Sequence, residues 1–108
     1  MTALITRSEL EKSLGDVVLV DALPASYYDK AHLPGAINLV ESDVEALAPK
    51  LLPNKDSAIA TYCSNGACGN SQAVANRLEK LGYTNVRKYR EGIQDWHAAG
   101  NNIEQTVA

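Results

Sequence analysis

The amino-acid sequence predicts an α/β domain with a mostly parallel sheet and helices on both of its faces. Short apolar segments typical of buried strands alternate along the chain with segments whose apolar residues have helical spacing. Glycine and proline fall between these segments, without a repeat or a low-complexity linker. The chain has 108 residues, of which 45% are hydrophobic, and this suits one core rather than two ordinary domains. We therefore expect a single domain over residues 1–108.

Four segments have the composition of buried strands. They are short and rich in β-branched and other apolar residues, as is typical of strands covered on both faces of a parallel sheet. The expected strands are residues 17–20, 36–40, 57–62 and 86–89. Because a helical segment separates each strand from the next, parallel connections are expected.

Helix-start and helix-stop signals lie between these strands. In chain order they are the capping box Ser8–Glu11, Pro24 before residues 25–30, the capping box Ser42–Glu45 with Pro49 as a limit, Ser71 as the cap of a helix that ends at Gly82, and Gly100 after a last helix.

Three expected strands end near polar or reactive residues, which are Asp21, Cys63 and Arg90. The carboxyl ends of parallel strands meet at one edge of the sheet, where ligands of α/β proteins bind. Cys63 is the only nucleophile candidate of the three. It precedes a helix, whose free N–H groups and dipole favour an anion and so the thiolate. The loop alone fits equally a cysteine that packs as a small apolar side chain.

The loop after this strand has the sequence CSNGACGN. Gly66 and Gly69 permit positive φ angles, which would turn backbone N–H groups inward to form a cradle for sulfur or for an anion. Arg90 can supply the positive charge that the loop lacks, or it can be part of a solvated basic edge. The expected substrate-binding residues are Ser64, Asn65, Gly66, Ala67, Cys68, Gly69, Asn70 and Arg90.

Five landmarks along the chain, taken in order, resemble those of the rhodanese family. They are residues 18–21 (VLVD), 31–38 (AHLPGAIN), 61–63 (TYC), 81–86 (LGYTNV) and 91–100 (EGIQDWHAAG), within a resemblance that covers residues 8–103. The resemblance implies a three-layer α/β domain with a central, mostly parallel sheet of about five strands. It also implies a catalytic Cys63 that forms a persulfide intermediate.

The chain departs from the family pattern in three places. Asp21 is followed by Ala22 and Leu23, where many members have Asp-x-Arg, and Glu91 replaces the first residue of a frequent Gly-Gly pair. The loop from Cys63 has eight residues instead of six, contains no Arg or Lys, and resembles a family variant with a second cysteine, here Cys68. The missing arginine predicts that thiosulfate is a poor sulfur donor.

The resulting hypothesis is a sulfurtransferase that works by two-step covalent catalysis. Cys63 would take sulfane sulfur from a small-molecule or protein-borne donor and pass it to a thiol acceptor, without a cofactor. Two alternatives stay open: a thiol redox protein that uses Cys63 and Cys68, and a non-catalytic binding or regulatory module. A cysteine phosphatase is disfavoured because Gly69 stands where such a loop would place its phosphate-binding arginine.

Composition argues against several other classes. The net charge of −3 is spread along the chain, so we expect no nucleic-acid partner. No apolar run has the length of a signal peptide or a bilayer span, so we expect a cytoplasmic protein with no membrane partner. The two cysteines are too few for a disulfide framework, and with His32 and His97 they lack zinc-ligand spacing, so we expect no metal site.

Overall fold

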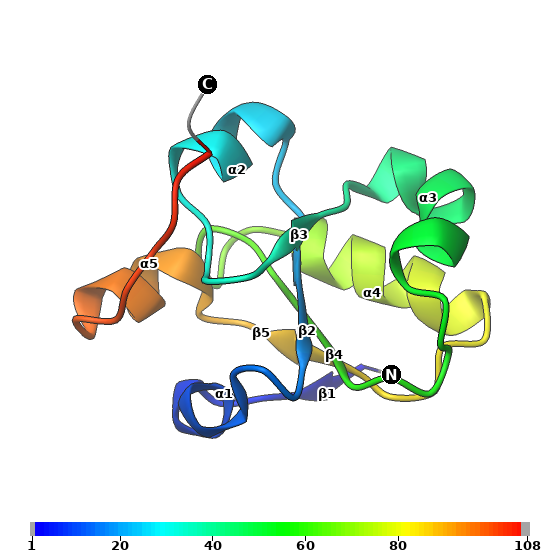
Figure 1. Ribbon diagram of the computed structural model, residues 1–108, viewed down its shortest axis with the longest axis horizontal. Helices are drawn as coiled ribbons and strands as arrows, with labels where there is room; N and C mark the ends of the chain where they lie inside the picture. Colours follow the sequence, from blue (N-terminus) through cyan, green and yellow to red (C-terminus); the bar gives the residue numbers. More distant parts are fainter. Residues whose placement is uncertain (1, 107–108) are drawn as a thin grey trace.

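The structure, a computed structural model that describes residues 2–106, is a three-layer α/β fold and confirms the predicted fold class. Five parallel strands form one sheet in the order β1-β5-β4-β2-β3 (Figure 1). The strands are β1 (Ala3–Leu4), β2 (Val18–Asp21), β3 (Ile37–Asn38), β4 (Ile59–Tyr62) and β5 (Val86–Tyr89). The central strand of this order, β4, is the strand that leads to Cys63.

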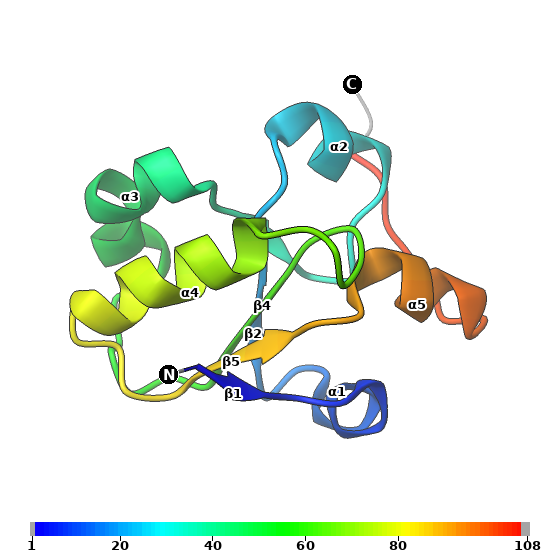
Figure 2. The same ribbon diagram turned by 180° about the vertical axis from the view of Figure 1, so that it is seen from behind.

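Helices cover both faces of the sheet. One side carries α1 (Arg7–Ser13) and α5 (Gly92–Ala98), and the other carries α3 (Val44–Leu51) and α4 (Asn70–Lys80), as Figures 1 and 2 show from opposite directions. The short helix α2 (Ala25–Lys30) follows β2, and a 3₁₀ turn, η1 (Glu41–Asp43), precedes α3. None of the helices within residues 2–106 combines the length and the apolar character that crossing a membrane requires.

Alternating side chains along the strands divide the core into two clusters, because successive strand residues point to opposite faces. The cluster toward α3 and α4 includes Val20, Ile59 and Val86. The cluster toward α1 and α5 includes Leu19, Ala60, Tyr89 and Trp96. The indole N–H of Trp96 donates to the Asn102 carbonyl at 2.8 Å, so the polar atom of this buried ring is satisfied.

The strand register aligns the carboxyl ends of β2, β4 and β5. Asp21 pairs with Tyr62, and Tyr62 pairs with Tyr89, which are the last residues of β2, β4 and β5. Cys63 and Arg90 therefore leave the sheet side by side at its carboxyl edge. The structure confirms this placement, which the strand endings predict.

The first strand is a feature that the sequence pattern does not reveal. β1 has only two residues, both exposed, and it pairs with β5 at the edge of the sheet. Two residues are too few to show an alternation of apolar and polar side chains. β3 is likewise shorter than the expected 36–40, because only Ile37 and Asn38 pair with β2.

Two expected helix starts are wrong. The capping box of α1 joins Thr6 to Glu9 rather than Ser8 to Glu11, because the chain is still extended at Thr6 as it leaves β1. Asp43 precedes α3 without a side-chain cap, so Ser42–Glu45 is not a capping box.

Pro49 lies inside α3 and does not limit the helix as expected. A proline at this position costs one backbone hydrogen bond. The buried side chains of Val44 and Ala48 pack α3 onto the core, and this packing offsets the loss.

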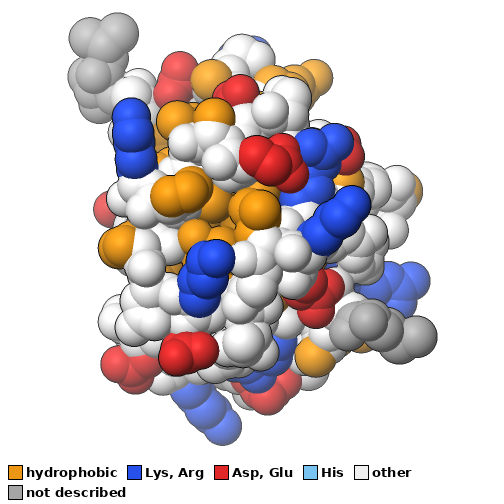
Figure 3. Space-filling view, turned by 90° about the vertical axis from the view of Figure 1, so that its right-hand side faces the viewer, with side chains coloured by type: hydrophobic (Ala, Val, Ile, Leu, Met, Phe, Trp, Pro, Cys, Tyr) orange, Lys and Arg blue, Asp and Glu red, His pale blue; other side chains and the backbone are white. Residues whose placement is uncertain are grey.

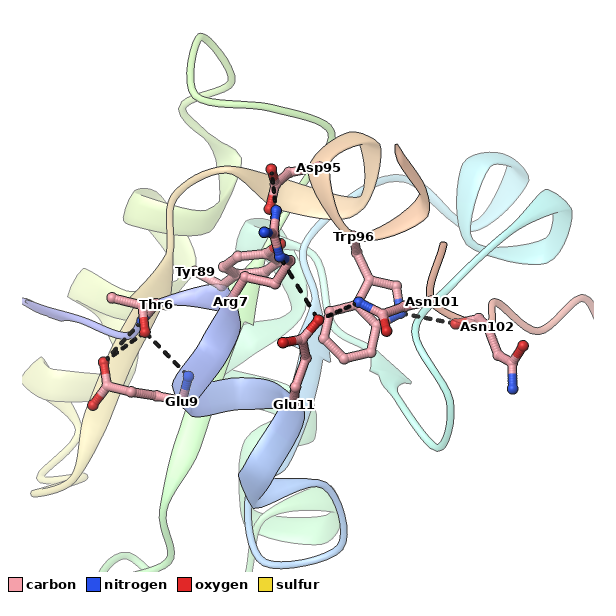
Figure 4. A network of polar contacts seen from close by, with 9 residues as sticks. All are labelled: Thr6, Arg7, Glu9, Glu11, Tyr89, Asp95, Trp96, Asn101 and Asn102. Carbon is pink, nitrogen blue, oxygen red and sulfur yellow. Dashed lines mark hydrogen bonds and ion pairs between the residues drawn. The ribbon is translucent and has the colours of Figure 1, made fainter. Parts of the chain in front are cut away.

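A polar network joins α1, β5 and α5 (Figure 4). The Arg7 guanidinium donates to Asp95 at 2.9 Å, and the buried Tyr89 hydroxyl donates to the same carboxylate at 2.6 Å. Burial first, and then the bond to Asp95, raises the pKa of Tyr89 above its ordinary value. At the other end of α1, Asn101 donates to Glu11 at 2.7 Å. These contacts hold α5 in place relative to the sheet.

The first turn of α5 binds the root of the cysteine loop, that is, the first two residues of the segment 63–70. The N–H groups of Ile93 and Gln94 donate to the carbonyls of Cys63 and Ser64 at 2.9 and 3.0 Å. Gly92 has a φ of 75°, and a Cβ atom there would overlap the Cys63 carbonyl and lie 2.6 Å from the Ser64 carbonyl. Both the backbone angle and the close approach require glycine at this position.

The capping box of α1 predicts different results for two neighbouring substitutions. Thr6→Ala removes the side chain that caps the Glu9 N–H, so we expect a loss of about 1 kcal/mol in the free energy of unfolding. Ser8→Ala, the matched control inside the helix, should change it by less than about 0.5 kcal/mol. Urea denaturation measures both values. A larger loss for Ser8→Ala would show that the helix begins two residues later.

The close approach at Gly92 predicts a second pair of results. Gly92→Ala meets a positive φ and a backbone clash, whereas Gly15→Ala meets a φ of 92° with nothing within 4 Å. We expect Gly92→Ala to lower the free energy of unfolding by about 1–3 kcal/mol more than Gly15→Ala, because overpacking is added to the backbone strain. Equal losses in urea denaturation would mean that the loop root can move away from α5 without cost.

Candidate active site

Cys63 follows β4 and lies beneath the start of α4, as the sequence predicts. Its side chain is buried, with 1% of its surface exposed. The Cys63 Sγ atom lies 3.5 Å from the Ser71 hydroxyl and 3.4 Å from the Cys68 carbonyl oxygen. The sulfur therefore lies beside the first turn of the eleven-residue helix α4, where the helix dipole stabilises negative charge.

Cys63 and Cys68 are joined by a disulfide, with their Cα atoms 6.4 Å apart. The loop between them folds back on itself and brings the half-buried Cys68 over the buried Cys63. The sequence leaves the role of Cys68 open between a passive loop residue and a redox partner. The structure shows that the two sulfur atoms can bond to each other within one loop.

The predicted positive φ angles at Gly66 and Gly69 are wrong. Neither residue is among the glycines with positive φ, and Gly69 has a φ of −89° as the residue before α4. The turn is built by Asn65 instead: its side-chain oxygen accepts from the Ala67 N–H at 2.9 Å, and its carbonyl accepts from the Cys68 N–H at 3.1 Å. These two N–H groups are therefore engaged inside the loop and do not contribute to the expected cradle.

Ser71 also departs from its predicted role as a helix cap. The helix begins at Asn70, and Ser71 is buried within its first turn. The Ser71 carbonyl accepts from the Thr61 hydroxyl at 3.1 Å, which joins the helix to β4. The Ser71 hydroxyl faces the Cys63 sulfur, a contact that places a hydrogen-bond donor beside the thiolate after reduction.

Two asparagines anchor the ends of the loop to neighbouring elements. The Asn65 amide donates to the Gln94 side chain of α5 at 3.2 Å, and the Asn70 amide donates to the Ala22 carbonyl after β2 at 3.4 Å. These two bonds tie the loop to α5 on one side and to the residue after β2 on the other. Their expected role in binding a substrate stays a prediction.

Arg90 lies beside the loop. A methyl group placed on Gly66 would be 3.8 Å from the Arg90 Nε atom and 4.0 Å from its Cγ atom. The exposed guanidinium therefore runs along the outside of a loop that has no cationic residue of its own. The role of Arg90 in supplying positive charge to the site stays a prediction.

A buried acid supports the site from the neighbouring strand. Asp21 is fully buried and accepts hydrogen bonds from the Tyr62 hydroxyl and the Leu23 N–H, both at 2.9 Å. The Tyr62 hydroxyl in turn accepts from the Leu33 N–H at 3.0 Å. Desolvation raises the pKa of Asp21 above its ordinary value, against the opposing effect of its hydrogen bonds. Tyr62 thus supplies a hydrogen-bond donor to the buried Asp21 carboxyl group.

His32 is buried near Asp21. Its ring stacks on Tyr28 with the ring centres 3.9 Å apart, and its Nδ1 atom is 2.7 Å from the Tyr28 carbonyl. Its backbone forms a bridge with Glu104. These contacts fix the ring and the backbone of His32.

On the face drawn in Figure 3, basic and acidic side chains are interspersed around a group of apolar side chains near the centre. Two surface hollows share Leu14 and Pro34 in their linings: one also contacts Trp96 and the other the start of β2.

Comparisons with known proteins agree with this geometry. A family model described as rhodanese-like domain matches residues 6–99. The chain is 30% identical to the HTH-type transcriptional regulator Rv0324 of Mycobacterium tuberculosis, over 94% of this chain and 44% of the regulator. It is 39% identical to a tRNA sulfurtransferase of Pyrobaculum aerophilum, over 79% of this chain and 17% of that protein. The chain thus spans less than half the length of either relative.

Solved structures show the same fold. The BH2092 protein of Bacillus halodurans superposes with a TM-score of 0.88 at 25% identity, over 97% of this chain and 78% of that one. A thiosulfate sulfurtransferase of Pseudomonas aeruginosa superposes with a TM-score of 0.85 at 27% identity, over 97% of this chain and 20% of that one. With the family match covering most of its length, the chain belongs to the rhodanese-like domain family.

Proposed function

We propose that the chain is a sulfurtransferase that carries sulfane sulfur as a persulfide on Cys63 and passes it to a thiol acceptor. The observation that carries the proposal is the position of Cys63 at the end of the central strand and beneath the first turn of α4. Two similar proteins have sulfurtransferase in their names, which supports the same reaction class. The donor is a small molecule or a protein-borne persulfide.

The first step requires reduced cysteines, because a disulfide-bonded Cys63 has no free thiol. The Cys63 thiolate attacks the outer sulfur of the donor and forms a new S–S bond. The old S–S bond of the donor breaks, and its electron pair leaves with sulfite from thiosulfate, or with a thiolate from a persulfide. The helix dipole and the Ser71 hydroxyl stabilise the attacking thiolate.

The second step returns the enzyme to its starting state. An acceptor thiolate attacks the outer sulfur of the Cys63 persulfide, and Cys63 leaves as a thiolate. The helix position that favours the thiolate also makes Cys63 a better leaving group. No group other than the donor and the acceptor is consumed.

Substitution of the two cysteines separates their roles. Cys63→Ser removes the nucleophile, so we expect sulfur transfer from a persulfide donor to a thiol acceptor to fall to the uncatalysed rate. The fold should persist, because one small side chain contributes little to the core. Cys68→Ser, the matched control, should keep measurable transfer. Stopped-flow transfer rates with circular dichroism test both points, and loss of activity in Cys68→Ser alone would favour a two-cysteine redox protein instead.

Donor choice gives another prediction. A bidentate, charge-assisted contact contributes about 1.5–3 kcal/mol, so a loop without arginine should use thiosulfate roughly 10- to 100-fold less efficiently than glutathione persulfide. Arg90→Ala should lower the remaining thiosulfate kcat/KM further. Arg87→Ala should not, because Arg87 lies three residues earlier within β5 and pairs with Glu9 at 3.6 Å. Equal or better efficiency with thiosulfate in the parent protein would contradict the donor argument.

A further inference from the structure

We propose that Cys68 resolves the Cys63 persulfide, so that the loop releases its sulfane sulfur as hydrosulfide and closes as the Cys63–Cys68 disulfide. This inference rests on the proposed function, because it needs a persulfide on Cys63. It adds a second outcome for the bound sulfur besides transfer to an external thiol. The observation behind it is that the loop brings Cys63 and Cys68 together as a disulfide pair, with their Cα atoms 6.4 Å apart.

The step balances without an added oxidant. The Cys68 thiolate attacks Sγ of Cys63, the inner sulfur of the persulfide, and forms the Cys63–Cys68 bond. The bond between Sγ and the outer sulfur breaks, and the outer sulfur leaves with the electron pair as hydrosulfide. The two cysteine sulfurs are oxidised to the disulfide, and the sulfane sulfur is reduced to sulfide. A dithiol reductant then restores both thiols.

The loop is built to hold the product of this step. Its root is fixed by α5, whose N–H groups bind the Cys63 and Ser64 carbonyls. The Asn65 turn directs the chain back, since its two bonds to the Ala67 and Cys68 N–H groups close the segment that carries Cys68. Cys68 is thus presented to the buried Cys63 sulfur by the folded loop, and not by random encounter.

Exposure differs between the two cysteines in a way that suits the step. Cys63 is buried, so an external thiol must displace the covering loop to reach its inner sulfur, whereas Cys68 already lies over it. Cys68 is itself half-buried and more exposed than Cys63, so a reductant can attack the disulfide from the Cys68 side. The exposed Arg90 guanidinium beside Gly66 favours departure of the hydrosulfide anion at the same edge.

The test adds less than one equivalent of glutathione persulfide to the fully reduced protein, with no other thiol present. In the parent we expect hydrosulfide release equal to the donor added, and an intact mass that shows the loss of two hydrogen atoms. In Cys68→Ser we expect a mass that shows the gain of one sulfur atom. Hydrosulfide release should be at least about tenfold slower there, because an internal thiol acts at a millimolar effective concentration.

A matched control keeps the number of thiols and changes only their placement. Ser57 precedes β4 and Cys63 follows it, so the two residues lie roughly 20 Å apart at the rise of a strand. The double variant Cys68→Ser/Ser57→Cys should therefore behave as Cys68→Ser does. Fast release in this variant would overturn the role assigned to Cys68.

The remaining outcomes separate the two proposals. If the parent gains a sulfur atom but keeps it at the rate of Cys68→Ser, the resolving role is wrong and the sulfurtransferase proposal stands. If neither the parent nor Cys68→Ser takes up sulfur or releases hydrosulfide, both proposals are overturned. Circular dichroism of each variant confirms that the comparison is made on folded protein.

Discussion

Two backbone hydrogen bonds from the first turn of α5 to the Cys63 and Ser64 carbonyls hold the root of the reactive loop. They form because Gly92 lets the chain turn with a positive φ and come close to the loop without a side chain in between. α5 is itself held by the Arg7, Asp95 and Tyr89 contacts, which join it to α1 and β5. The exposed Arg7 ion pair adds little, so the buried tyrosine is the firmer link.

Loss of the loop arginine and gain of a second cysteine change the chemistry in the same direction. A loop without a fixed cation is poorly suited to a dianionic donor, and its Asn65 turn engages N–H groups that would otherwise face an anion. The same turn carries Cys68 over Cys63. We therefore expect weaker recognition of an anionic donor within the loop, which has gained an internal thiol. Both features suit persulfide exchange between thiols better than thiosulfate chemistry.

The sequence was sufficient to predict the fold class, the positions of the main strands along the chain and the placement of Cys63 and Arg90 at one edge, because these depend on apolar runs and parallel connections. It was insufficient for β1, which is too short for a pattern, and for the helix start at Thr6, because Thr6–Glu9 and Ser8–Glu11 have the same spacing. The prediction of positive φ angles at Gly66 and Gly69 was wrong for another reason. Glycine permits positive φ without requiring it, and here an asparagine side chain makes the turn. Tyr62 and Gly92 matter through contacts between distant segments, which no local pattern reveals.

That Cys63 itself carries the sulfur is tested most directly by locating the added atom in the chain. The Cys68→Ser variant would be treated with glutathione persulfide, alkylated at once and digested, and its peptides fragmented in a mass spectrometer. The fragments that contain Cys63 should carry one additional sulfur between the side chain and the alkyl group. Consumption of the donor with an alkylated Cys63 that carries no additional sulfur would contradict a persulfide carrier at this position.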